Sequence, residues 1–402
     1  GGGGLAERRA LVVRTEDFIL LVIGLSWLAK TAVNKELGLV AKTPLNRPIV
    51  LYVTATLLAT LVGYLTGTVG TATGFFYVLK YVEYFFVYYM AVNNLRDRPH
   101  AWRMVVAAFL TAALASLVGA AQIPSGERVS APFEGEVGEP NTFGGYLLLL
   151  MAIAGGVALE TDRLRVRLAC LALVGLMSVP FAFTLSRASY LGVPAVLLVL
   201  AALSRQRTLM RGLVVLAPAL ALVLAVLLPG PVVDRIAYTF QPEAGQPTVR
   251  LGRVGLDPST SARLISFRQA MEGWWQRPVL GWGVTGFGFM DAQYPRALVE
   301  TGVVGFAAFI GLLWAVLRSG RAAHAALRDR EDRGLALGFL AGTAGLAVHA
   351  IGANSFIIVR IMEPFWLFAG IVVMLPVLPP PAAGASPRPA PVRPPARPAV
   401  RP

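Results

Sequence analysis

The residues best suited to chemistry in this sequence are two arginines and an aspartate that stand in unusual surroundings. Arg187 lies between the apolar runs 181–185 and 190–193, and Arg263 and Asp291 belong to a later polar stretch. A guanidinium group stays charged and can hold two phosphate oxygens at once. A carboxylate can take a proton from a hydroxyl group. Together these residue types suit a substrate that carries a phosphate or pyrophosphate.

Two of these residues also have a purely structural interpretation. Arg187 can snorkel toward lipid headgroups, and Asp291 can cap a helix that begins near Pro295.

Two pairs of opposite charges are spaced three residues apart, as in ion pairs within a helix. These pairs are Lys80–Glu83, where the ion pair is the favoured interpretation, and Arg360–Glu363.

The composition places these residues in a membrane protein. The 402-residue chain has 56% hydrophobic and 14% charged residues, and its mean hydropathy is +0.64. A soluble domain of this size needs more charge to cover its surface. The net charge of +14 is explained by topology, because Lys and Arg concentrate in cytoplasmic loops. Nucleic acid is therefore not an expected partner.

Apolar segments long enough to cross a bilayer recur along the chain. The predicted fold is an all-α polytopic membrane protein with about eleven transmembrane helices. Residues 1–378 form its membrane domain, which includes one long outer loop at about 231–297, and residues 379–402 are expected to be a disordered Pro/Ala/Arg tail. The predicted spans are 18–33, 49–68, 73–94, 104–122, 141–159, 168–184, 189–203, 212–230, 298–317, 335–353 and 361–378.

Arginine-rich loops predict the orientation. If every predicted span crosses, the loops around Arg98, Arg165, Arg207 and Arg330 share the cytoplasmic side, and the long loop faces outward. The basic N-terminal stretch does not fit eleven spans. Either a first helix has been removed, which gives twelve in the intact chain, or residues 5–33 form an interfacial or re-entrant segment.

The long outer loop has two features of its own. Its glycines between 281 and 288 resemble a phosphate loop in content, but the Lys-Ser/Thr ending is missing, so tight turns beneath aromatic side chains are the preferred interpretation. Residues 259–275 are predicted to form an amphipathic helix entered through Asp257 and Pro258. The residues expected to pack on the membrane domain are Leu264, Phe267, Met271 and Trp274.

Neither a metal nor a cofactor is expected. Cys170 is the sole cysteine, so neither an intramolecular disulfide nor a cysteine cluster can form. His100, His324 and His349 are too dispersed to indicate a zinc site. His349 is expected to be a helix-packing or polar-contact residue.

Several short segments occur in an order that resembles one known family. They are 139–146, 185–190, 261–263, 277–283, 291–294, 300–302 and 360–366. Their order around a single long outer loop resembles the O-antigen ligase/polymerase superfamily of bacterial surface-polysaccharide assembly. The resemblance extends from about residue 43 to residue 366.

The resemblance implies a metal-independent, inverting glycosyltransferase of the membrane GT-C class. Such an enzyme lies in the bacterial inner membrane with its site facing the periplasm, and its donor is a glycan linked to undecaprenyl pyrophosphate. The implied catalytic residues are Asp291, Arg187 and Arg263, of which the two arginines hold the pyrophosphate. Further expected substrate-binding residues are Glu139, Asn141, Arg296 and Arg360.

One departure from the family pattern bears on the reaction. The ligases carry a His-Asn type motif just before the Glu-x-Gly element, and that histidine is the proposed base. This sequence has Asp291 and Ala292 there, which favours a polymerase that joins lipid-linked repeat units. A chain-length-regulating membrane protein is then a further expected partner. The alternatives are an O-antigen ligase that acts on lipid A core and a polysaccharide or lipid transporter.

Overall fold

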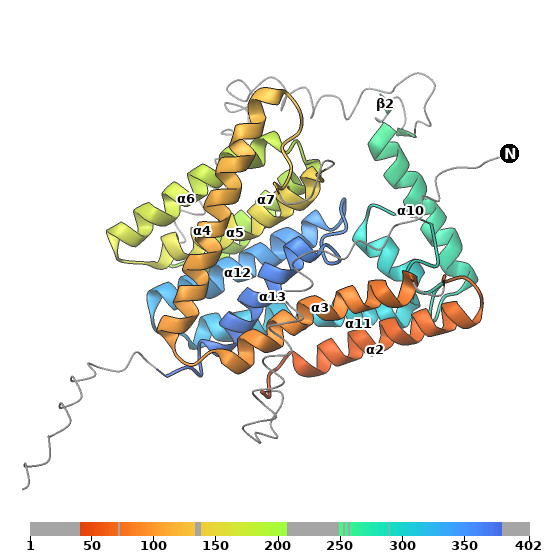
Figure 1. The fold of residues 1–402 in the computed structure, drawn as a ribbon, viewed down its shortest axis with the longest axis horizontal. Helices are drawn as coiled ribbons and strands as arrows, with labels where there is room; N and C mark the ends of the chain where they lie inside the picture. The colour runs from red at the N-terminus through yellow and green to blue at the C-terminus, as the bar shows by residue number, and fades with distance from the viewer. Residues whose placement is uncertain are drawn as a thin grey trace, which may run out of the picture.

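The computed structural model describes residues 41–379, apart from 71–72, 133–137, 207–248, 252–253, 256–257 and 289. Long helices form the body of the molecule, and another helix, α10, runs crosswise to α2 and α3 near their ends (Figure 1). The predicted spans 18–33 and 212–230, the basic N-terminal stretch and nearly all of the C-terminal tail lie outside the described residues.

Each of the other predicted spans corresponds to a helix. Six of the described helices, α2 to α6 and α11, are long and apolar enough to cross a membrane, and α7 is a shorter apolar helix. The chain is therefore a multi-pass helical membrane protein, and the total of eleven spans stays a prediction. The bounds are α2 Asn46–Leu65, α3 Thr73–Asn94, α4 Arg98–Gln122, α5 Pro140–Glu160, α6 Leu164–Phe183, α7 Arg187–Leu203, α11 Gln293–Ala326, α12 Arg330–His349 and α13 Val359–Met374.

The predicted outer loop contributes helix α10, Pro258–Gln276, which confirms the helix predicted at 259–275. Proline is well tolerated at a helix start, because the N–H group that it lacks has no partner within the helix there. Two short strands precede α10: β1, Arg250–Leu251, pairs antiparallel with β2, Val254–Gly255. A 3-10 turn, η1, Ile123–Ser125, follows α4.

The four apolar side chains predicted to pack on the membrane domain differ in their burial. Met271 and Trp274 pack against a small buried cluster, as predicted. Leu264 and Phe267 are 41% and 49% exposed, so the predicted packing is wrong for these two residues. The buried cluster consists of Ala270, Met290 and Val299.

Helices α5 and α12 approach each other closely through glycines. A Cβ atom on Gly338 would lie 2.5 Å from the Cα atom of Ile153, and one on Gly156 would lie 2.4 Å from the backbone nitrogen of Gly338. Gly334 and Gly342 continue the same face of α12 at a spacing of four residues. Small residues at this spacing let backbones pack closely, which stabilises helix association in lipid through van der Waals contact.

Helix α11 bends sharply at Gly302, whose φ of 64° and ψ of −171° are not helical. Glycine adopts such a conformation without the steric cost of a side chain. A straight helix would separate residues 294 and 309 by about 22 Å along its axis. The ring centroids of Tyr294 and Phe309 are 6.2 Å apart, so the arms 293–301 and 303–326 fold toward each other. The predicted span 298–317 lies within α11, but this bend divides it.

A glycine-rich loop, residues 278–286, fills the angle of the bend. Gly281 and Gly283 have φ values of 66° and 84°, which confirms the tight turns predicted for this loop. Four main-chain hydrogen bonds among the described residues join the loop to α11. Trp282 donates to Val299 at 3.0 Å and Gly283 donates to Glu300 at 2.8 Å, whereas Val303 donates to Pro278 at 2.8 Å and Val304 donates to Val279 at 3.3 Å.

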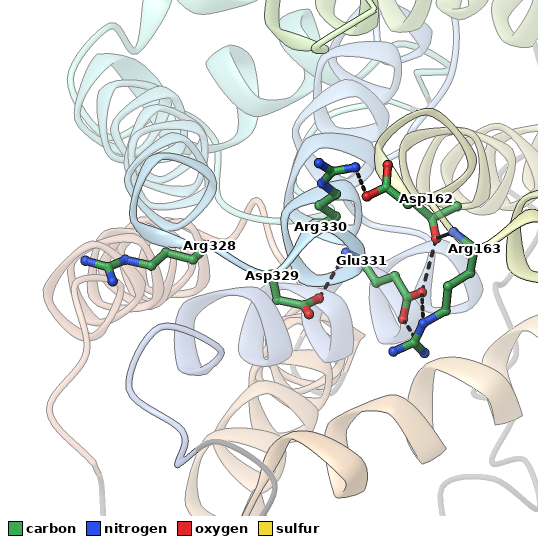
Figure 2. Close-up of a pocket in the computed structure, with 7 residues that line it drawn as sticks. Asp162, Arg163, Arg328, Asp329, Arg330 and Glu331 are labelled. Atoms are coloured by element: carbon green, nitrogen blue, oxygen red, sulfur yellow. Dashed lines mark hydrogen bonds and ion pairs between the residues drawn. The ribbon is translucent and has the colours of Figure 1, made fainter.

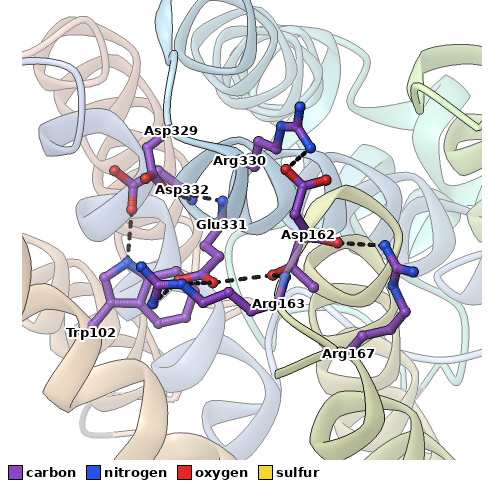
Figure 3. Close-up of polar contacts among 9 residues, drawn as sticks. Trp102, Asp162, Arg163, Arg167, Asp329, Arg330, Glu331 and Asp332 are labelled. Carbon is purple, nitrogen blue, oxygen red and sulfur yellow. Dashed lines mark hydrogen bonds and ion pairs between the residues drawn. The ribbon is translucent and has the colours of Figure 1, made fainter. Parts of the chain in front are cut away.

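Three of the arginine-rich loops, those around Arg98, Arg165 and Arg330, meet at one end of the helix bundle, whereas Arg207 lies outside the described residues. Arg98 lies 3.3 Å from the carboxylate of Asp332, which also accepts a hydrogen bond from Trp102 at 2.7 Å (Figure 3). The loop after α5 and the start of α12 line a pocket at this end, across which Arg330 pairs with Asp162 (Figure 2). The predicted ion pair between Lys80 and Glu83 is also confirmed, at 3.0 Å.

The glycine contact between α5 and α12 generates a prediction for stability. We expect Gly338→Ala to lower the melting temperature of the detergent-purified protein, because the added methyl group meets the α5 backbone. Overpacking of this kind costs about 1–3 kcal/mol. The matched control is Gly175→Ala on α6, where nothing lies within 4 Å of the new Cβ atom and alanine is the better helix former. Equal melting temperatures for the two variants would contradict the glycine contact.

Candidate functional site

The centre of the candidate site is an ion pair between Arg263 of α10 and Asp291, which precedes α11. Nη2 of Arg263 lies 3.2 Å from Oδ2 of Asp291, and the two side chains are 27% and 29% exposed. The structure thus brings together two of the three residues that the resemblance implies as catalytic. Asp291 does not cap α11, because the N-cap residue is Ala292 and no side chain caps the helix. The capping interpretation is wrong.

The loop between α12 and α13, residues 350–358, holds the backbone on both sides of Asp291. The amide of Asn354 donates to the Met290 carbonyl at 2.7 Å. The backbone N–H of Gln293 donates to the Ala350 carbonyl at 3.1 Å. These two bonds fix the backbone before and after Asp291, and so they position its carboxylate beside Arg263.

The surroundings raise the pKa of Asp291 above the usual range of an aspartate. Partial burial is the main cause, because it disfavours the charged form. The positive charges of Arg263 and Arg296 act in the opposite direction and lower this pKa, but they offset only part of the effect. Asp291 therefore holds a proton more readily than an exposed aspartate does, which suits a group that accepts one.

The first turns of α5 and α7 are joined by buried polar side chains. Ser186 is the N-cap of α7, and its hydroxyl donates to the side-chain oxygen of Asn141 at 2.8 Å. Ser189 donates to the Ser186 hydroxyl, also at 2.8 Å. The Asn141 amide donates in turn to Glu139 at 3.5 Å. Burial, and after it the negative charge of Asp291, raises the pKa of Glu139. Asn141 thereby positions the helix start that carries Arg187.

Arg128 is a residue of this end that the sequence analysis does not single out. Its guanidinium donates to the carbonyls of Thr184 at 2.9 Å and Leu185 at 3.3 Å. Leu185 has a φ of 49°, a left-handed conformation that is uncommon for a residue with a side chain. Arg128 therefore stabilises the strained corner that leads into Arg187. The available signal was its charge, because the predicted orientation places Arg128 on the outer side, where the positive-inside pattern does not call for an arginine.

Arg187 and Arg360 lie at the starts of α7 and α13, at the same end of the molecule as Asp291. Arg187 is half-buried at the first residue of α7, and its neighbour Ala188 lies 3.3 Å from a Cβ position at Gly352, in the loop that holds Asp291. Arg360 is half-buried in the first turn of α13. Helix N-termini carry partial positive charge, so the starts of these helices add to the positive potential of the arginines.

Arg296, unlike Arg187, Arg263 and Arg360, is almost fully buried. Its guanidinium lies 3.2 Å from the Glu300 carboxylate, and both side chains are only 6% exposed. The same carboxylate accepts a hydrogen bond from the backbone of Thr285 at 3.1 Å. Arg296 and Glu300 thus connect the bent part of α11 to the glycine-rich loop. The side chain of Arg263 is more exposed than that of Arg296.

His349 is fully buried at the end of α12, beside the site. Its Nδ1 atom lies 2.6 Å from the Ser355 hydroxyl, which confirms its predicted role as a polar-contact residue. Its Nε2 atom has no hydrogen-bond partner among the described residues.

A comparison with known families identifies the part of the chain that carries most of this site. Residues 172–310 match a family model described as O-antigen ligase. The match includes Arg187, Arg263, Asp291 and Arg296, and it ends beyond the bend of α11. No curated protein matches the chain. Residues 172–310 are thus similar to the O-antigen ligase family, which confirms the predicted resemblance to the O-antigen ligase/polymerase superfamily.

Proposed function

We propose that this protein is a polymerase that joins glycan repeat units carried on undecaprenyl pyrophosphate. The observation that carries the proposal is the Arg263–Asp291 contact at 3.2 Å. It combines a cation for a departing pyrophosphate with a carboxylate for an attacking hydroxyl. The family match supports O-antigen ligase/polymerase-type activity, and the aspartate in place of the ligases' histidine favours the polymerase branch.

The proposed reaction is a metal-independent transfer with inversion at the anomeric carbon. A hydroxyl oxygen of one lipid-linked unit attacks the anomeric carbon of the other glycan, and the bond from that carbon to the pyrophosphate oxygen breaks. The hydroxyl proton passes to Asp291, and undecaprenyl pyrophosphate leaves with the bonding electrons. Arg187 and Arg263 stabilise the charge that develops on the leaving group, as preorganised cations do in other transfer reactions.

The remaining predicted site residues have supporting parts in this proposal. Arg360 adds positive charge near the pyrophosphate, and Glu139 and Asn141 bind the glycan beside the start of α7. Arg296 contributes through Glu300, by holding the bend that presents Asp291. The proposed setting is a GT-C-type domain with about eleven spans in the bacterial inner membrane. Its site faces the periplasm, and a chain-length-regulating membrane protein is a proposed partner.

The ligase remains a second candidate, because the matching family model is described as O-antigen ligase. The two reactions share a donor and differ in the acceptor. Purified protein in vesicles should be given the lipid-linked repeat unit with and without lipid A core. A ladder of lengths on the lipid carrier would support the polymerase, and single-step capture by the core would support the ligase. Movement of the lipid-linked glycan across the vesicle membrane without bond formation would support a transporter instead.

Loss of the proposed base or of a pyrophosphate ligand should slow chain formation in this assay. We expect Asp291→Asn to reduce the rate about 100-fold or more, because the acceptor loses its proton acceptor. Arg187→Gln and Arg263→Gln should each have an effect of about 100-fold through lost charge stabilisation. The rate is measured as lipid-linked product formed per unit time.

Controls for these variants lie on α10, the helix that carries Arg263. Arg268 and Glu272 form an ion pair with side chains 84% and 62% exposed, so Arg268→Gln and Glu272→Gln should leave the rate near that of the parent. Unchanged rates for all three site variants would refute the proposed site.

The environment of Asp291 also predicts a pH dependence. Asp291 accepts a proton only when ionised, so the rate falls as the pH drops through its pKa, which lies above that of an ordinary aspartate. Arg263 lowers this pKa, so Arg263→Gln should raise it and move the acid limb of the residual activity to higher pH. Arg263→Lys retains the charge and should leave the limb nearly in place. Identical acid limbs in the Gln and Lys variants would contradict the assignment of Asp291 as the base.

A further inference from the structure

Part of the surface of helix α10 is apolar although it is exposed. Leu264, Phe267 and Trp275 are 41%, 49% and 72% exposed, and their spacing places them on one side of the helix. The three residues are called the apolar stripe below. Beside it lies an exposed polar side that contains Gln269, Gln276 and the Arg268–Glu272 ion pair. A third side, with Ala270 and Gly273, is buried.

The end of α10 lies at the depth where a span leaves the hydrocarbon layer. Helix α2 has 20 residues, which correspond to a length of about 30 Å and match the hydrocarbon thickness of a bilayer. Arg277, the residue after α10, donates a hydrogen bond to Thr66, the residue after α2, at 2.8 Å. The C-terminal end of α10 is therefore level with the end of a transmembrane helix.

The apolar stripe continues into apolar surface of the spans. Val279, just beyond α10, is 58% exposed, and its carbonyl accepts a hydrogen bond from the backbone of Val304 at 3.3 Å. Val303 and Val304 on the long arm of α11 are 48% and 44% exposed, and Leu65 at the end of α2 is 73% exposed. The exposed apolar surface of α11 thus continues through Val279 to Trp275 of the apolar stripe.

The residue types at this junction are those typical of a membrane interface. Tryptophan and arginine concentrate where hydrocarbon meets headgroups, because each has an apolar body and a polar group. The guanidinium of Arg277 lies 4.4 Å from the ring centroid of Trp282. Trp275 is two residues away from Arg277 in sequence, and α10 runs crosswise to α2 and α3 (Figure 1). A helix in this position lies along the membrane surface.

We propose that the apolar stripe of α10 inserts into the outer leaflet of the lipid bilayer. The occupant is the bulk acyl chains, because the stripe is continuous with span surfaces that lipid covers. The polar side of α10 then faces water and headgroups. Arg263 directly precedes Leu264, so this docking holds its guanidinium at headgroup level. The proposal does not depend on the proposed function, since it concerns only where α10 lies.

Spin labels on single cysteines test this placement in the full chain. In a Cys170→Ala background, Leu264→Cys, Phe267→Cys and Trp275→Cys probe the stripe, and Arg268→Cys, Glu272→Cys and Gln276→Cys are matched controls on the polar side. Each labelled variant is reconstituted into phosphatidylcholine–phosphatidylglycerol vesicles that contain no polyprenyl lipid. Collision rates are measured with oxygen, which concentrates in hydrocarbon, and with a water-soluble nickel chelate, which is excluded from it.

We expect the oxygen-to-nickel collision ratio to be several-fold higher at the three stripe positions than at the three control positions. Equal ratios on the two sides would overturn the proposal, because the stripe would then face water. Shielding from both reagents would overturn it as well, since another part of the protein would cover the stripe. Oxygen access that appears only after addition of a polyprenyl pyrophosphate would also overturn it, by assigning the stripe to the substrate's tail. A melting temperature near that of the parent shows that each variant is folded, and Phe267→Cys and Trp275→Cys carry the test if Leu264→Cys does not fold.

Discussion

Backbone groups inside a membrane protein must find hydrogen-bond partners within the protein, because lipid offers none. Helix α11 departs from helical geometry at Gly302, and the glycine-rich loop supplies partners for its backbone on both sides of the bend. A Cβ atom at Gly302 would lie 2.2 Å from the Val279 carbonyl oxygen, so the loop fits only a glycine there. The bend and the loop therefore depend on each other.

The bend has a direct consequence for the candidate site. Because the arms of α11 fold toward each other, the chain that leads into the first arm lies beside the end of α12, where Gln293 bonds to Ala350. Asp291 is then held between the loop after α12 and Arg263 of α10. With a straight α11, this aspartate would project away from the bundle. The buried Arg296–Glu300 pair stabilises the bent form, since Glu300 also accepts a hydrogen bond from the glycine-rich loop.

The length of the apolar segments was sufficient to predict the helices at the described spans. The order of the family-like segments singled out Arg263 and Asp291, which the structure pairs. The sequence did not reveal the bend, since Gly302 stands in an apolar run that is compatible with a continuous helix, and a lone glycine there has several explanations. It was also wrong about Leu264 and Phe267. Helical periodicity shows that residues share a side, but it does not show whether protein, water or lipid lies opposite that side.

Under the proposed function, the ion pair at the centre of the site couples substrate binding to proton transfer. Before binding, Arg263 stabilises the charged form of Asp291 and so lowers its proton affinity. A pyrophosphate brings further negative charge to the same guanidinium and takes up part of its hydrogen-bonding capacity. Asp291 then loses part of its counter-charge beside a new anion, and both changes raise its affinity for a proton. The carboxylate therefore becomes a stronger base when the leaving group is in place, which is when the acceptor hydroxyl must lose its proton.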